Sequence, residues 1–302
     1  MISGFSTTGA SILSDVEVLS HCSLLWRSFT HWIGGMGVLV FLLAVIPLSG
    51  GSDMNLMRAE TTGPSVGKLV PKVKQTARIL YIIYIGLTAV YLVLLLLGKM
   101  PLFDAQNGVF EGITHATFQV AAVITSTGFF TQDFDQWSQT CKTILVLLMF
   151  IGSCAGSTSC GLKVSRCIIL VKTILKEMTS YIHPKSIKKI KFEDRPVEHE
   201  VVRACNVYFI SYILVFSLSF VLISLEGKDF STTFTSTSAT LNNTGPGLSY
   251  VGPIQNYGHF SFFSKYVMMF NMLAGRLELF PILMLFHPAI WKELVSRRYS
   301  KK

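Results

Sequence analysis

Charged residues are scarce in this sequence: Asp, Glu, Lys and Arg together make up 14% of its 302 residues, against about 25% in soluble domains. Half of the residues are hydrophobic, and the mean hydropathy is +0.51. The apolar residues stand in long runs, near the ~20 residues that a helix needs to cross a bilayer. This composition excludes an ordinary soluble domain and indicates an integral membrane protein.

Paired cysteines and catalytic motifs are also missing. The six cysteines form no C-x-x-C pair, so neither a disulfide framework nor a zinc site is indicated. The seven histidines form no H-E-x-x-H pattern, and the sequence contains neither a G-x-S-x-G elbow nor a Walker loop. We therefore expect no enzyme and no bound cofactor.

Five apolar segments predict membrane spans, at about 29–48, 79–97, 143–175, 204–225 and 266–286. The third segment would be roughly 50 Å long as one helix, well beyond the ~30 Å hydrocarbon core. Its middle, 152–161, consists of small and polar residues. We therefore expect that span to be interrupted by a non-helical loop, which is tolerated at membrane depth only against protein or a water-filled cavity.

The net charge of +9 is confined to alternate loops. The loops after the first and third segments and the C-terminal tail are rich in Lys and Arg, whereas the loops between them hold few basic residues. This alternation is the topology signal of a membrane protein, not a nucleic-acid-binding stripe. It predicts five spans with the N-terminus outside and the C-terminus in the cytoplasm.

Three regions on the predicted outer side share a Thr-Gly pair. They contain Ser6-Thr7-Thr8-Gly9, Thr125-Ser126-Thr127-Gly128 and Asn242-Asn243-Thr244-Gly245. The second and third follow segments 108–120 and 230–241, which are too short to span and suit re-entrant helices. A selectivity filter replaces the hydration shell of a cation with backbone carbonyls, and glycine readily adopts the unusual backbone angles that this requires.

The alternative is that these three loops are ordinary turns, since Thr-Gly is a common dipeptide. Asn242-Asn243-Thr244 is also an N-glycosylation sequon, although a glycan and a pore would exclude each other at one place. If the filter interpretation holds, a bulky residue in place of Gly245 should block ion flux.

Arg276 and Glu278 interrupt the last apolar segment. Ionisable groups at membrane depth usually face the bundle interior or a cavity. Two residues apart on a helix, these side chains diverge and are not an ideal mutual pair. Either residue can form a structural ion pair with another helix, or Arg276 can lie on a conduction path below the filter.

The sequence resembles the Trk/Ktr/HKT superfamily of cation transporters, in particular its bacterial TrkH-type potassium uptake subunits. The resemblance rests on stretches in family order at 3–10, 31–37, 58–64, 156–163, 239–247 and 275–278. The family fold is all-α, with pseudo-repeated helix–pore loop–helix units around a central pore. Members form homodimers in the bacterial inner membrane and bind a cytosolic nucleotide-binding regulatory subunit of the TrkA type.

The resemblance also implies roles for individual residues. The filter that binds K+ would consist of Thr7, Thr8, Gly9, Ser126, Thr127, Gly128, Asn243, Thr244 and Gly245. The intramembrane gate below it would consist of Gly152, Ser153, Gly156, Ser157, Thr158, Gly161 and Arg276.

The sequence departs from the family pattern in two ways. It begins inside the first filter loop, and near Asp104-Ala105-Gln106 it passes from the first helix of repeat two directly to the pore helix of repeat three. We therefore expect the end of repeat one at 1–76, one helix of repeat two at 77–105, repeat three at 106–202 and repeat four at 203–302. Two hypotheses remain: potassium uptake through the Thr-Gly loops, or a non-conducting membrane scaffold that lacks one filter wall.

Overall fold

The computed structural model describes residues 2–9, 20–36, 73–97, 108–152, 157, 160–183, 190–192, 195–286 and 288. Its helices are α1 (Ile2–Phe5), α2 (His21–Met36), α6 (Val73–Leu97), α7 (Gly108–Ile124), α8 (Gln139–Phe150), α9 (Val164–Ile182), α10 (His199–Ser224), α11 (Phe230–Leu241), α12 (Phe262–Arg276) and α13 (Leu279–Leu285). Short 3-10 turns at Phe134–Gln136, Ser249–Val251 and Tyr257–His259 lie in the connections. A two-residue antiparallel pair, β1 (Lys191–Phe192) with β2 (Arg195–Pro196), follows α9.

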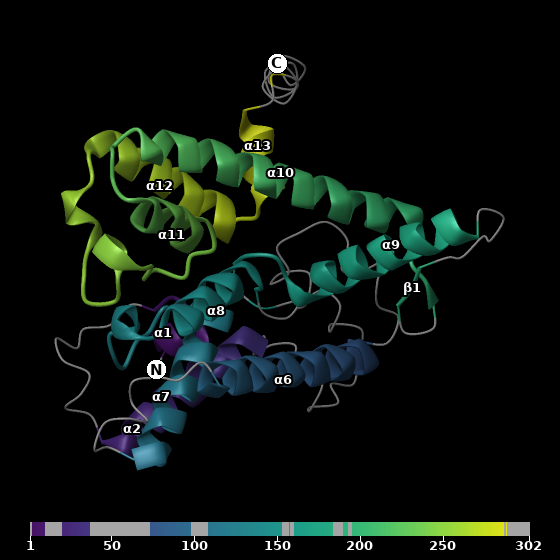
Figure 1. The fold of residues 1–302 in the computed structure, drawn as a ribbon. Helices are drawn as coiled ribbons and strands as arrows, with labels where there is room; N and C mark the ends of the chain where they lie inside the picture. The colour runs from purple at the N-terminus through teal and green to yellow at the C-terminus, as the bar shows by residue number, and fades with distance from the viewer. Residues whose placement is uncertain are drawn as a thin grey trace, which may run out of the picture.

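The helices form two groups (Figure 1). One contains α1, α2, α6, α7 and α8, and the other contains α10 to α13, while α9 lies between them. The core of the first group includes Tyr84, Val120, Ile124 and Leu145. Tyr208, Tyr212, Leu241 and Ile282 form part of the second core. Helix α11 contacts both α12 in its own group and α8 in the first group.

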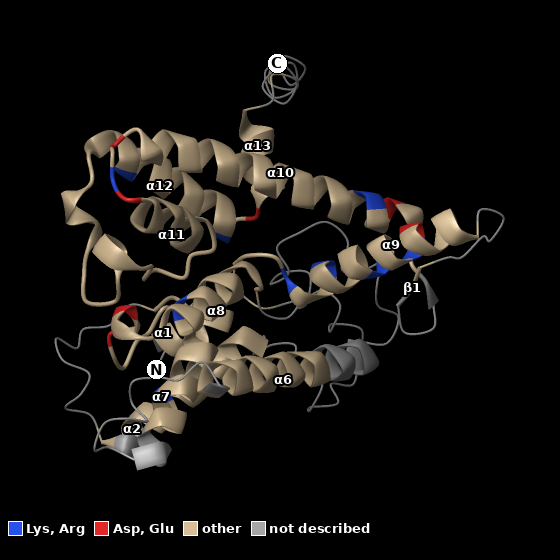
Figure 2. Ribbon diagram, in the orientation of Figure 1, with Lys and Arg blue, Asp and Glu red and all other residues tan. Residues whose placement is uncertain are grey.

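The outward face of the helices is apolar. On α10, Ile210, Leu214, Leu218 and Val221 are all more than half exposed, and their spacing places them on one side of the helix. Figure 2 shows that charged residues are sparse on α10 to α12 and appear on α9 and at the beginning of α10. A long apolar stripe that faces outward is typical of a surface in contact with lipid or a partner.

The predicted spans fall on helices of different lengths. In the described part of the chain, only α10 is both long and apolar enough to cross a membrane alone; apolar stretches 81–96, 112–124 and 139–150 are shorter. The predicted span 79–97 falls within α6, and 204–225 within α10 and its cap. Helix α2 contains the beginning of the predicted span 29–48, and its remainder lies outside the described residues.

The third and fifth predicted spans are both interrupted. The expected break separates α8 from α9, and residues 151, 152, 157 and 160–163 of that segment are non-helical. The fifth span was expected to be continuous, and this expectation is wrong, because α12 ends at Arg276 and α13 begins at Leu279. Glu278 between them has a φ of 63°, a left-handed conformation that cannot continue an α-helix.

Helices occupy both predicted short segments. Helix α11 has the predicted bounds 230–241, whereas α7 continues to Ile124, four residues beyond the predicted end. Helix α1 occupies the position that corresponds to the end of a third such helix. Each of these three helices leads directly into one of the Thr-Gly loops.

Candidate functional site

The three Thr-Gly loops have the same backbone conformation. We call them loop one (Thr7 to Gly9), loop two (Ser126 to Gly128) and loop three (Asn243 to Gly245). The first residue of each has a φ between 51° and 53°, and the glycine has a φ of 74°, 71° and 93° in turn. A non-glycine residue with positive φ is uncommon. This conformation recurs at the first position of all three loops, which is occupied by a different residue type in each, so it indicates a shared structural requirement that the Thr-Gly pair alone does not reveal.

The hydrogen bonds of the loops repeat as well. In each loop the amide N–H groups of the threonine and the glycine donate to one carbonyl in the last turn of the preceding helix. The acceptors are Ser3 (3.0 and 3.5 Å), Ala122 (3.0 and 3.3 Å) and Ala239 (2.9 and 3.5 Å). Because these bonds resemble a helix C-cap, each loop turns away from its helix in the same direction.

The loops lie against one another in chain order. A Cβ atom placed on Gly9 would overlap the Thr127 carbonyl oxygen, and one placed on Gly128 would overlap the Thr244 carbonyl oxygen. Only a glycine permits such a close approach of two backbones. At Gly245, no described atom lies within 4 Å of the corresponding position. The described loops thus lie side by side in chain order, and the threonine carbonyls of loops two and three each lie next to the glycine of the loop before.

Side-chain hydrogen bonds hold two of the loops in position. At loop two, Thr125 and Thr127 share a hydroxyl–hydroxyl hydrogen bond of 2.8 Å. At loop three, the Asn243 side-chain amide donates to the Met272 carbonyl at 2.9 Å, and the Tyr257 hydroxyl donates to the Gly245 carbonyl at 2.7 Å. That carbonyl therefore has its orientation set by a hydrogen bond.

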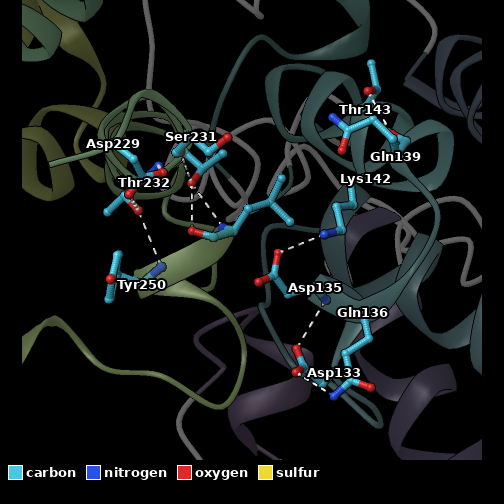
Figure 3. Close-up of polar contacts among 12 residues, drawn as sticks. Asp133, Asp135, Gln136, Gln139, Lys142, Thr143, Asp229, Ser231, Thr232 and Tyr250 are labelled. Atoms are coloured by element: carbon cyan, nitrogen blue, oxygen red, sulfur yellow. Dashed lines mark hydrogen bonds and ion pairs between the residues drawn. The ribbon is translucent and has the colours of Figure 1, made fainter.

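The connections that flank α11 and follow loop two are fixed by polar contacts (Figure 3). Asp229 caps α11 by accepting from the Thr232 amide at 3.0 Å, and Thr232 in turn accepts from the Tyr250 amide at 3.3 Å. The Thr232 contacts tie the pore-helix candidate α11 to the chain that follows loop three. Asp135, in the connection after loop two, forms an ion pair of 3.4 Å with Lys142 of α8.

The Asp229 cap permits a test of this connection. Asp229→Ala should destabilise the protein by about 0.5–2 kcal/mol, measured as a lower thermal unfolding midpoint in detergent. Although partial burial raises the pKa of this carboxyl, hydrogen bonds from Thr232 outweigh it and lower the pKa below its usual value. A carboxyl with a lowered folded-state pKa stabilises the protein above its unfolded pKa of about 3.9, and this stabilisation is lost as the pH falls through the folded pKa.

Asp229→Asn is the matched control, because it retains an acceptor for the cap but does not titrate. This variant should keep most of the stability and lose the acid dependence contributed by Asp229. An unchanged unfolding midpoint in Asp229→Ala would show that the cap does not support α11.

The described residues at the two ends of the candidate gate segment lie close to one another and to the residue before loop three. Gly152 donates its amide to the Leu162 carbonyl at 2.9 Å, and the Leu162 amide donates to the Phe150 carbonyl at 3.3 Å. Gly161 has a φ of 84°, and a Cβ placed there would lie 3.1 Å from the Asn242 side-chain oxygen. Ser157 is buried. The other predicted gate residues of this segment, Ser153, Gly156 and Thr158, lie outside the described residues.

Arg276 and Glu278 have different partners. The Arg276 guanidinium donates to the carbonyl of Ser6, next to loop one, at 3.3 Å. Glu278 is 4% exposed and pairs with Arg166 at 2.9 Å and with Lys163 at 3.4 Å. Glu278 therefore forms a buried ion pair with residues at the beginning of α9. Arg276, the last residue of α12, instead contacts the chain next to loop one.

Sequence reasoning did not identify Lys163 and Arg166 as the partners of Glu278. They are more than 110 residues away in the chain, and no local pattern connects them. The sequence did contain one signal for this pairing. Lys163 and Arg166 follow one interrupted span and Glu278 lies in another, and buried charges are usually paired.

The family model described as TrkH, cation transport protein, matches residues 1–108 and 102–293 in two parts. The Trk system potassium uptake protein TrkH of Salmonella typhimurium is 30% identical over 379 residues, covering 96% of this chain and 78% of that protein. TrkG of Escherichia coli strain K12, also described as a Trk system potassium uptake protein, is 27% identical with the same coverage. The alignment with the first relative is longer than this 302-residue chain, so at least 77 of its positions have no counterpart here.

The fold agrees with this assignment. A crystal structure of the potassium transporter TrkH from Vibrio parahaemolyticus superimposes with a TM-score of 0.66 at 25% identity, covering 96% of this chain and 77% of that one. The prediction of an all-α membrane transporter fold is thereby confirmed. The two-part family match and the similarity along nearly the whole chain lead to one conclusion: this chain belongs to the TrkH family of cation transport proteins.

Proposed function

We propose that this chain is a membrane subunit that takes up potassium ions through a pore lined by loops one, two and three. The supporting observation is the threefold recurrence of one backbone conformation and hydrogen-bond pattern in loops that lie against one another. Backbone carbonyls held in this way can replace the hydration shell of a monovalent cation. The filter residues are Thr7, Thr8, Gly9, Ser126, Thr127, Gly128, Asn243, Thr244 and Gly245.

The gate lies on the inner side of these loops in this proposal. It consists of the interrupted segment with Gly152, Ser153, Gly156, Ser157, Thr158 and Gly161, together with Arg276. Contact of Gly161 with Asn242, directly before loop three, supports a coupling between this segment and the filter. The cation of Arg276 beside the Ser6 carbonyl would oppose a potassium ion that leaves loop one.

Assembly and topology follow from the family membership and remain part of the proposal. The subunit would lie in the bacterial inner membrane with its C-terminus in the cytoplasm, where the basic loops stand. It would form a homodimer and bind a nucleotide-binding regulatory subunit of the TrkA type. The four segments 1–76, 77–105, 106–202 and 203–302 would correspond to parts of repeats one, two, three and four.

Uptake of rubidium, a potassium substitute, tests the function in cells that lack their own potassium uptake systems. Saturable rubidium uptake that depends on this chain supports conduction by the three walls. Protein that reaches the membrane in normal amount but gives no uptake above the empty-vector background would refute it.

A non-conducting scaffold is the second candidate, and two observations favour it. No described atom lies beside Gly245 at the position where Gly9 and Gly128 each meet the next wall. The relative that aligns over 379 residues also has at least 77 positions that this chain lacks. The rubidium experiment separates the two candidates, because a scaffold would reach the membrane without transporting the ion.

Arg276→Gln should raise the maximal rate of rubidium uptake and leave the preference for rubidium over sodium within about twofold of wild type. The reason is that the side chain contacts the Ser6 carbonyl below loop one and does not line the carbonyls of the Thr-Gly pairs; removing its charge lowers a barrier that acts on every monovalent cation. Arg276→Lys keeps the positive charge and should therefore keep the maximal uptake rate of the wild type. A change in preference without a change in rate would contradict the gate role.

A further inference from the structure

Helix α2 presents two residues to the phenylalanine that follows loop two. Arg27 and His31 stand four residues apart and so lie on the same side of the helix. The Arg27 guanidinium carbon lies 3.8 Å from the centroid of the Phe129 ring. The His31 ring meets the same ring edge-to-face, at 5.9 Å between centroids and an interplanar angle of 89°. Contacts of both kinds are attractive beyond the burial of area.

Phe129 packs at the base of loop two. It follows Gly128 in the chain, and it forms a buried cluster with Phe118 and Ala122 of α7. The Ala122 carbonyl is the acceptor for the amides of both Thr127 and Gly128. His31 also contacts the Phe118 ring, at 5.2 Å between centroids. The rings therefore enclose the turn at which loop two leaves its helix.

Loop three has a different residue at the position that Phe129 occupies after loop two. There the residue after the glycine is Pro246, whose ring restricts φ to about −65°. Phe129 has no such covalent restriction. Loop two therefore depends on packing against Phe129 for the rigidity that a proline ring supplies in loop three.

His31 acts in this cluster as an aromatic ring. It is fully buried, and the Ala121 backbone of α7 is its hydrogen-bond partner, through a bond too poorly aligned to count among the regular hydrogen bonds of the described residues. A phenyl ring can therefore replace the packing of this side chain, whereas a methyl group cannot. Arg27 is only half-buried and contributes the cation over the ring.

We propose that Arg27, His31 and Phe118 hold Phe129 and thereby position loop two, so that these residues determine how strongly the filter prefers potassium over sodium. We call these four residues the Phe129 cluster. The inference rests on the proposed function, because it assigns a specificity role within that filter. The cluster residues position the carbonyls and do not themselves contact the ion.

Cation-dependent thermal unfolding of the purified chain in detergent tests the role without requiring flux. The unfolding midpoint is titrated with potassium chloride and, separately, with sodium chloride, which yields the ratio of the two apparent affinities. His31→Ala should lower this ratio by about fivefold, the change expected for the loss of one buried aromatic pair. His31→Phe should keep it within about twofold, and Phe29→Ala, at a ring that is 47% exposed on the same helix, should leave it unchanged.

Arg27→Met provides a second variant if His31→Ala does not fold, because it retains the aliphatic stem and removes only the cation over the ring; it should also lower the ratio. The proposal is overturned if His31→Ala and Arg27→Met both retain the wild-type ratio, or if His31→Phe lowers it as much as His31→Ala. A wild-type chain with equal affinity for the two cations would overturn the filter itself, and the cluster role with it. Sodium competition in rubidium uptake should change in the same order across these variants.

Discussion

Gly128→Ala is expected to reduce rubidium uptake by about tenfold or more. A Cβ atom at this position overlaps the Thr244 carbonyl oxygen and approaches the Pro246 ring, so either loop two or loop three must move. A tenfold loss corresponds to ~1.4 kcal/mol, and in the proposed filter the displacement of a carbonyl that replaces ion hydration would cost at least that much. The measurement is initial rubidium uptake, normalised to the amount of the chain in the membrane.

Two other glycines distinguish overlap from backbone strain. Gly227 has a φ of 73° but no described atom near its Cβ position, and it lies in the connection between α10 and α11. Gly227→Ala carries only the cost of a positive φ and should retain most of the uptake. Equal losses in Gly128→Ala and Gly227→Ala would show that contact between the walls is unimportant.

Gly245 should be less sensitive than the sequence alone suggests. Its φ of 93° disfavours any side chain, but its Cβ position is open among the described residues. Alanine at Gly245 is therefore expected to reduce uptake less than alanine at Gly128, whereas a bulky residue at Gly245 would enter the proposed path of the ion and block uptake. The reason for this ranking is that loop three lies beside Gly128, whereas no described residue lies beside the Cβ position of Gly245.

Glu278→Gln is expected to destabilise the protein by about 3–5 kcal/mol, the cost of breaking a buried ion pair by removing one partner. Glu278 is the acidic partner of both Lys163 and Arg166, and glutamine would leave two cations in a buried place without compensation. We expect a large fall in the thermal unfolding midpoint in detergent and a smaller amount of chain in the membrane.

Two comparisons isolate the buried charge. Glu177→Gln removes an exposed carboxylate whose distance to Lys176 is 3.9 Å, and it should cost under about 1 kcal/mol. Combining Glu278→Gln with Lys163→Met should recover part of the lost stability, because the second change removes one uncompensated cation. If Glu278→Gln is no more destabilising than Glu177→Gln, the buried ion pairs contribute little to the fold.

The two interrupted spans illustrate how far local sequence can predict structure. The break between α8 and α9 could be anticipated, since residues 152–161 are small and polar and the apolar segment is too long for one helix. The break between α12 and α13 could not, because 266–286 has an ordinary length and only two charges. Glu278 leaves the helix to meet Lys163 and Arg166, and those partners come from a distant part of the chain.

The candidate site divides in a similar way. The positions of the three Thr-Gly loops, and of the short helices before loops two and three, could be predicted from composition and length. The positive φ of Thr7, Ser126 and Asn243 did not, since three different residue types occupy one conformation. A left-handed residue ends each helix because the two following amides then reach one carbonyl of its last turn.

The sequence by itself determined the membrane class, the helical architecture, the family and the places of the three Thr-Gly loops, because apolar length, loop charge and short motifs are local properties. The tertiary structure alone decided which glycine lies against which carbonyl, that Arg276 contacts Ser6 while Glu278 pairs with Lys163 and Arg166, and that α2 contacts Phe129. Each of these contacts joins segments far apart in the chain, and packing between helices brings such segments together without leaving a local signal in the sequence.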